Sequence, residues 1–438
     1  MHTDAQGNIL NGATPQAAAH YTAAVNQFNA YRGDPIAEID AAIAAAPGCA
    51  MARLFKAHLL ATATEPAATQ AAVDILNGLA ATALDDREAS HATAIRQVTD
   101  GNWTHAATTL DHHSMRWPHD MVALQAGHLV DFFRASARSL RDRIARTLPL
   151  WPHDMPGRSY VLGMYAFGLE EAGDYARAEE AGRAAVAADP ADSWAHHAVA
   201  HVMEMQGRAE DGIGWMQARQ AHWADDSNFF QIHNWWHQAL FHLDLEQHAD
   251  VLALYDTHIR AGASGIAVNL VDASALLWRL ALIGVDTGDR WHAVAEAWQA
   301  HADGALYSFN DLHAAMAYLG AGRLQDVDAL LDRYRANAHD LSETGHWQRA
   351  YGLPLIEGFK DYWTGNNTAA VDKLHRARGI ANGFGGSHAQ RDVIDWTLIA
   401  AAMRGKLRTT ALSLAHERLA HKPFSPVNRA YLAQARSL

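Results

Sequence analysis

A recurring pattern of glycine and proline is the feature of this sequence that most restricts its fold. In the clearest example, residues 159–190, Gly173 separates two apolar, alanine-rich segments and Pro190 ends the second. Glycine favours the left-handed conformation that closes a helix, and proline prevents a helix from continuing. The tetrapeptide Trp-Pro-His-Asp occurs at 117–120 and again 34 residues later, at 151–154. We therefore expect consecutive helix pairs of similar length.

The next segment repeats the pattern, with a predicted helix at 194–205, a turn at Gly207 and a second helix to about residue 222. Val, Ile and Thr runs alternating with a period of two, which would indicate strands, are absent. Helix pairs of this kind bury their apolar faces by stacking. The sequence thus predicts an all-α fold, a tetratricopeptide-type α-solenoid of antiparallel helix pairs, with a non-repetitive helical bundle as the alternative. We expect a loosely ordered segment at residues 1–18 and a single solenoid domain at 19–434.

Charge and cysteine content narrow the functional classes. The 438 residues carry a net charge of −13, whereas nucleic-acid binding needs Lys and Arg to neutralise phosphates. Cys49 is the single cysteine, which excludes an internal disulfide and a multi-cysteine zinc site. No run approaches the roughly 20 apolar residues of a membrane span, and no signal peptide is recognisable. We expect a soluble, cytoplasmic protein with a small-molecule substrate and without nucleic-acid or membrane partners; a homo-oligomer remains open.

Histidine is unusually frequent, with 28 residues dispersed along the chain. One predicted helix places two of them and a glutamate at helical spacing. His197, His201 and Glu204 are spaced i, i+4 and i+7, which places them on one helix face. Such a face can bind a divalent metal such as zinc through imidazole nitrogens and a carboxylate. The same groups can instead supply a general base and its orienting partner.

A second histidine pair follows in the next predicted repeat. His233 and His237 are again four residues apart, with Trp235 and Trp236 between them. The first helices of adjacent repeats pack roughly 10 Å apart, so we expect both pairs to meet on the concave surface. The alternative is that each pair merely packs within the fold. The candidate metal ligands are His197, His201, Glu204, His233 and His237.

Two later helices add polar residues to the predicted groove. Asp311 and His313 stand near the start of one helix, although Asp311 can also be its N-cap. His388, Arg391 and Asp392 share one face of another. If the solenoid coils tightly, these residues should complete the site from its far wall. The predicted catalytic residues are His197, His201, Glu204, His233, His237, Asp311, His313, His388 and Asp392. The predicted substrate-binding residues are His128, Tyr160, Trp235, Trp236 and Arg391.

From about residue 85 to the C-terminus the chain resembles the tetratricopeptide repeat protein 38 family. The motifs that carry the resemblance are residues 194–207, His233-Asn-Trp-Trp-His237, residues 309–313 with Gly320-Ala-Gly322, and His388-Ala-Gln-Arg-Asp392. The resemblance implies a tetratricopeptide-like superhelix and no particular reaction.

Two functional hypotheses from different classes follow. The first is a small-molecule enzyme that uses the His, Asp and Glu cluster, with hydrolysis of an amide or ester by metal- or His-activated water as the simplest reaction. A lyase or isomerase with a histidine base fits the same residues. The alternative is a protein-interaction scaffold that binds a peptide in its groove, where the acidic chain favours a basic partner. A metal- or pH-sensing protein is a third interpretation.

Overall fold

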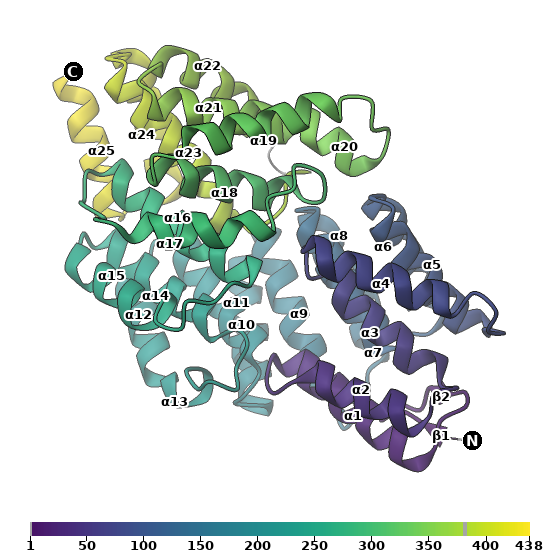
Figure 1. The fold of residues 1–438 in the computed structure, drawn as a ribbon. Coiled ribbons are helices and arrows are strands. Elements are labelled where there is room, and N and C mark those ends of the chain that lie inside the picture. Colours follow the sequence, from purple (N-terminus) through teal and green to yellow (C-terminus); the bar gives the residue numbers. More distant parts are fainter. Residues whose placement is uncertain (1, 380–382) are drawn as a thin grey trace. The chain divides into compact units, whose positions relative to one another are not determined.

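The computed structural model describes residues 2–379 and 383–438, and it confirms the predicted all-α solenoid class. Helices follow one another along the chain, and consecutive helices pack in pairs (Figure 1). In the described residues the strands are two short ones, β1 (His2–Thr3) and β2 (Ile9–Leu10), which pair antiparallel. Residues 2–10 therefore form a small hairpin, and the first helix begins at Pro15, within the segment expected to be loose.

The helices group into two compact units, where the sequence suggested one continuous domain. The first unit runs to Val199 and includes Ala221–Gln231, and the second comprises Ala200–Gln220 and Ile232–Leu438. The boundary thus falls inside one helix, α11 (Ser193–Met205), which continues from one unit into the other.

The first unit is built from packed pairs such as α1 with α2, α3 with α4, α5 with α6 and α9 with α10. Its helices are α1 (Pro15–Ala30), α2 (Pro35–Ala45), α3 (Ala50–Ala61), α4 (Pro66–Gly78), α5 (Asp86–Thr99), α6 (Trp103–Arg116), α7 (Met121–Phe133), α8 (Ala137–Thr147), the 3₁₀ turn η1 (Leu148–Leu150), α9 (Arg158–Glu171) and α10 (Tyr175–Ala188). The short helix α13 (Gln220–Trp223) lies at the boundary.

In the second unit, α16 packs on α17, α18 on α19, and α21 on α22. Its helices are α12 (Ala209–Ala218), α14 (Gln231–Asp244), α15 (His248–Leu254), α16 (Ala267–Leu282), α17 (Arg290–Ala297), α18 (Ser308–Gly320), α19 (Leu324–Ala336), α20 (Glu343–Trp347), α21 (Leu353–Trp363), α22 (Asn367–Arg378), α23 (His388–Arg404), α24 (Arg408–His421) and α25 (Pro426–Ser437). Two π-helical turns, η2 (Tyr255–Ile259) and η4 (Gln348–Gly352), and the 3₁₀ turn η3 (Trp298–Ala300) interrupt the α-helical series.

The helix ends follow the chemistry of the turns. Gly173 and Gly207 both adopt the left-handed conformation, with φ of 81° and 69°, and end α9 and α11 as predicted. Ser387 and Gln390 form a reciprocal capping box at the start of α23, which satisfies two backbone N–H groups there. Among the described residues no helix combines the length and apolarity needed to cross a membrane.

Close packing between α12 and α14 positions the helix that carries His233 and His237. An added Cβ at Gly212 would lie 2.4 Å from the Phe241 ring, whereas nothing lies within 4 Å of one at Gly214. Phe241 is fully buried, so its ring has little room to move.

These two glycines give a matched pair of substitutions on one helix. We expect Gly212→Ala to destabilise the protein by about 1–3 kcal/mol, because the new methyl group overpacks against Phe241. Gly214→Ala should instead stabilise it by about 0.5–1 kcal/mol through helix propensity. Urea denaturation of both variants measures the difference, and equal stabilities would contradict the packing argument.

Candidate functional site

A cluster of buried histidines lies in the second unit, where α11 and α14 contribute side chains. His201 and His237 are fully buried and His233 is 5% exposed. The Nε2 atoms of His233 and His237 are 3.2 Å apart, and the ring centroids of His201 and His237 are 4.5 Å apart. One ring nitrogen of each histidine lies within 4.8 Å of the others. Three imidazoles therefore converge on one point, as their helical spacing led us to expect.

A carboxylate on a third helix orients this cluster. Asp272 of α16, which is fully buried, accepts a hydrogen bond from His233 Nδ1 at 2.8 Å. An ionised carboxylate only accepts hydrogen bonds, so Nδ1 of His233 donates this one, and Nε2 of the same ring is directed at His237. Trp236 stacks on the His233 ring, with centroids 5.2 Å apart, and fixes its plane.

Burial favours the neutral form of His201. Burial, and then the charges of neighbouring groups, lowers the pKa of His201 well below its usual range; these groups include His233, His388, Lys422 and Arg391. Burial raises the pKa of Asp272, against the opposing influence of His233. A neutral imidazole is the protonation state that can bind a metal.

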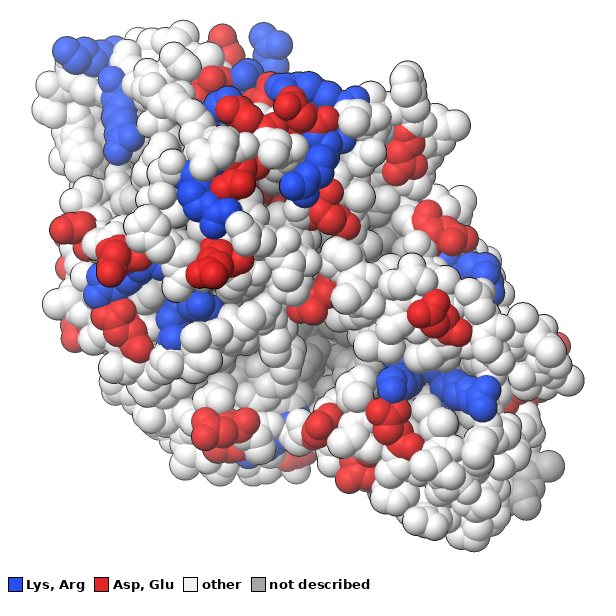
Figure 2. All heavy atoms as spheres, viewed as in Figure 1, with Lys and Arg blue, Asp and Glu red and all other residues white. Residues whose placement is uncertain are grey.

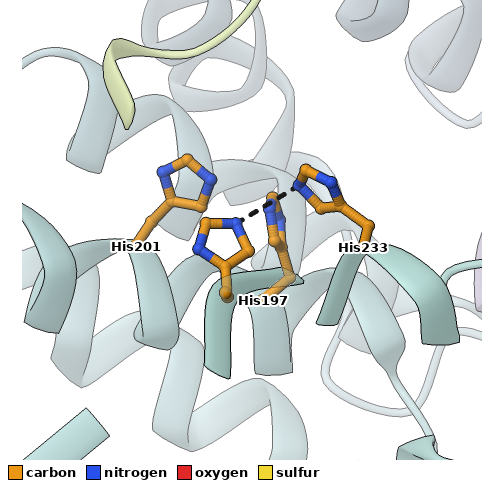
Figure 3. A group of neighbouring side chains, drawn as sticks. His197, His201 and His233 are labelled. Atoms are coloured by element: carbon orange, nitrogen blue, oxygen red, sulfur yellow. Dashed lines mark hydrogen bonds between the residues drawn. The ribbon is translucent and has the colours of Figure 1, made fainter. Parts of the chain in front are cut away.

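His197 precedes His201 by one turn on α11. In the second unit, Figure 3 shows the His201 and His233 side chains with their rings directed toward one another. Within the first unit, an aromatic enclosure surrounds the His197 ring, made by Phe167, Trp194 and Phe230 with centroids 5.5, 4.9 and 4.9 Å away. The His197 ring therefore packs among aromatic side chains of the first unit.

Glu204 does not join the histidines as predicted. Its carboxylate accepts a hydrogen bond from Lys422 Nζ at 2.6 Å, and the two side chains are about nine-tenths buried. Although burial lowers the pKa of Lys422, the charges of Glu204 and other carboxylates raise it overall, so the pair is ionised. A buried carboxylate is stabilised more by an ammonium ion than by neutral imidazoles, which accounts for the difference.

A charged pocket of about 190 Å³ lies in the second unit beside this ion pair. Its walls come from α22, α23, α24 and the ends of α11 and α25. The lining residues are Met205, Arg378, His388, Arg391, Asp392, Ile394, Asp395, Glu417, Arg418, His421, Lys422 and Asn428. The structure thus brings His388, Arg391 and Asp392 together in one pocket.

Ion pairs hold the pocket walls in place. Both oxygens of Asp392 accept hydrogen bonds from the Arg418 guanidinium, at 2.8 and 3.0 Å. Burial alone would raise the pKa of Asp392, but Arg418 lowers it below its usual range. Because its pKa is lowered and both of its oxygens accept hydrogen bonds from Arg418, the Asp392 carboxylate is a weak base and does not suit general-base catalysis.

Asp311 and His313 have other partners. Asp311 is not the N-cap of α18, because the helix begins at Ser308, and its carboxyl accepts a hydrogen bond from Tyr334 at 2.8 Å. Burial raises the pKa of Asp311 to about 8. His313 Nδ1 donates to the Phe309 carbonyl at 2.7 Å, and burial lowers its pKa to about 4.

The predicted substrate-binding residues lie in different surroundings. In the first unit, Trp194 Nε1 donates to His128 Nε2 at 3.1 Å, and Tyr160 lies on α9, where burial raises its pKa above its usual range. Trp235 stacks on His258 with centroids 3.8 Å apart. Trp236 contacts the histidine cluster and Arg391 lines the charged pocket.

The first unit contains a polar cluster that the sequence analysis missed. Asp120 Oδ2 accepts hydrogen bonds from Arg87 at 2.6 Å, His91 at 3.0 Å and His113 at 3.3 Å. His58 lies 2.9 Å from the other nitrogen of His91. Burial raises the pKa of Asp120, but these cations and hydrogen bonds hold it well below its usual range. The signal was present, since Asp120 ends the first Trp-Pro-His-Asp motif.

Comparison with protein-family models finds no match for this chain. Among solved structures the chain is similar to one described as the human IFIT1 dimer with m7Gppp-AAAA. The two are 12% identical, with a TM-score of 0.44, over 98% of this chain and 92% of that one. That chain is solved with a nucleic acid as a dimer, which contradicts the expectation of a small-molecule substrate and no nucleic-acid partner. We withdraw that expectation.

The raised pKa of Asp311 predicts a specific pH dependence. An unfolded aspartate has a pKa near 3.9, so between about pH 4 and 8 the folded state binds the extra proton and stability falls as pH rises. Asp311→Asn removes this dependence. Its free energy of unfolding relative to wild type, measured by urea denaturation, should rise steadily from pH 5 to pH 8, by up to about 1.4 kcal/mol per pH unit.

Asp332→Asn serves as the control for this measurement, because the Asp332 side chain is 74% exposed. Its free energy of unfolding relative to wild type should stay constant over the same pH range. An equally flat profile for Asp311→Asn would show that the buried carboxyl is ionised when folded.

Proposed function

We propose that this protein is a helical-repeat scaffold that binds an acidic polypeptide segment in the charged pocket of its second unit. The observation that supports the proposal is the local charge of that pocket. Its lining holds four cationic side chains, Arg378, Arg391, Arg418 and Lys422, against three carboxylates; Lys422 is also paired with Glu204, and two histidines add positive charge when they are protonated. An acidic partner is therefore favoured locally, although the whole chain has a net charge of −13.

The surroundings of the pocket suit a polypeptide. Glu417 and His421 are exposed at its edge, and Phe424, two residues beyond Lys422, is 71% exposed. Exposed aromatic side chains are common anchors in protein interfaces. On the face drawn in Figure 2, small groups of Lys and Arg lie next to Asp and Glu, and most of the surface is uncharged.

The resemblance to the tetratricopeptide repeat protein 38 family is part of the same proposal. That family shares the pattern of repeated helix pairs and the motif at His388–Asp392, which contributes residues to one wall of the pocket. Hydrolysis at the histidine cluster stays a prediction. The ion pairs of Glu204 with Lys422 and of Asp392 with Arg418 favour binding over catalysis, because they engage two of the predicted catalytic carboxylates.

Fluorescence anisotropy tests the proposal with three dye-labelled probes: a Glu-rich peptide, a Lys-rich peptide of equal length and an m7Gppp-capped oligoadenylate. We expect the Glu-rich peptide to bind best and its affinity to fall as salt rises. Arg391→Gln should weaken its binding about tenfold, because a charge-assisted contact contributes about 1.5–3 kcal/mol.

Arg408→Gln is the matched control, since Arg408 is exposed on α24 and does not line the pocket. This variant should bind the Glu-rich peptide like the wild type. Preference for the capped oligonucleotide, or equal loss in both variants, would contradict binding of an acidic peptide in this pocket.

A further inference from the structure

The separation between histidine nitrogens in the second unit matches metal coordination. Zinc binds imidazole nitrogen at about 2.0–2.1 Å, so two nitrogens of one tetrahedral site lie about 3.3–3.4 Å apart. The Nε2 atoms of His233 and His237 are 3.2 Å apart. A nitrogen of His201 lies within 4.8 Å of both, a gap that small side-chain rotations can close.

The outer contacts of the cluster are also those of a metal site. A histidine ligand of a metal usually donates its other ring N–H to a carboxylate or carbonyl, which fixes the tautomer and makes the ligating nitrogen more basic. Asp272 accepts this hydrogen bond from His233 Nδ1, at 2.8 Å, and is itself fully buried. Trp236 packs on the same ring. This arrangement leaves Nε2 of His233 directed at His237.

The free-energy cost of burying three polar imidazoles also favours a metal-binding role for the cluster. Three imidazoles, 0–5% exposed, occupy volume that apolar side chains would fill more favourably. The cluster in the first unit differs, because there Arg87 and two histidines already engage Asp120. In the second unit the carboxylate lies behind one histidine, and the nitrogens face one another.

We propose that His201, His233 and His237 bind one divalent transition-metal ion of the zinc class, with Asp272 as a positioning residue behind His233. Imidazole ligands suit zinc, copper, nickel and iron, and the tetrahedral spacing favours zinc. The site is independent of the acidic-peptide proposal, because it uses none of the residues that line the charged pocket.

The full-length protein, prepared without a polyhistidine tag and stripped with a chelator, provides the direct test. Titration with Zn²⁺ against a chromophoric chelator should show one ion bound per chain, and Co²⁺ should give the intense visible absorption of a four-coordinate site. Binding should weaken at acidic pH, because protons compete with the metal for the imidazole nitrogens. Absence of binding by the wild-type chain would overturn the proposal.

Two histidine substitutions on α14 separate this site from the remaining histidines. His237→Ala should lower zinc affinity at least 100-fold. His242→Ala should leave it unchanged, because His242 is half-buried on the same helix and contacts Gln247 instead. Wild-type affinity in His237→Ala would contradict the proposal, as would equal losses in both variants.

Asp272→Asn tests the positioning role without creating a cavity. We expect zinc affinity to fall about 10- to 100-fold while the stoichiometry stays at one, as is typical for loss of an outer-shell carboxylate. Circular dichroism and melting temperature of the metal-free variants show whether each has folded. Failure of Glu-rich peptide binding would leave these metal measurements unaffected, so the two proposals fail separately.

Discussion

The carboxylate of Asp120 accepts hydrogen bonds from side chains of two helices, and Asp120 is also the N-cap of a third helix. Arg87 and His91 reach it from α5 and His113 from α6, and its other oxygen caps the backbone of Ala123 in α7. An unpaired buried charge costs several kcal/mol, so these helices are stable only in the register that completes the set. Apolar stacking alone tolerates sliding between helices, whereas this requirement does not.

The second unit applies the same constraint at two carboxylates. Asp272 couples α16 to α14 through His233, and Asp392 couples α23 to α24 through Arg418. The same two interactions also shape the two candidate sites. Asp272 sets the direction in which His233 presents its nitrogen, and the Asp392–Arg418 pair spaces the walls of the charged pocket. The polar residues that restrict the fold are therefore also those that build the two proposed sites.

Local signals were readable from the sequence because glycine and proline act on their own neighbours. The boundaries of α9, α10 and α11 follow from Gly173, Gly207 and Pro190, and the helical spacing of His233 and His237 predicted their shared face. Ion pairs and hydrogen bonds between residues far apart in the sequence could not be predicted. Nothing near Glu204 indicates that a lysine 218 residues later would pair with it, and a periodic pattern cannot show that α11 spans two compact units.

That same ion pair affects how the protein is made. Lys422 leaves the ribosome roughly 10–40 s after Glu204 at about 5–20 residues per second, and Ser425 must also return to Asp244. The first unit has all its residues once Gln231 is synthesised, so it can fold co-translationally. The second unit must wait for Lys422, and until then the Glu204 carboxylate stays hydrated. Vectorial synthesis thus imposes an order of assembly, and a nascent chain stalled before residue 422 would expose an incomplete unit to chaperones and proteases.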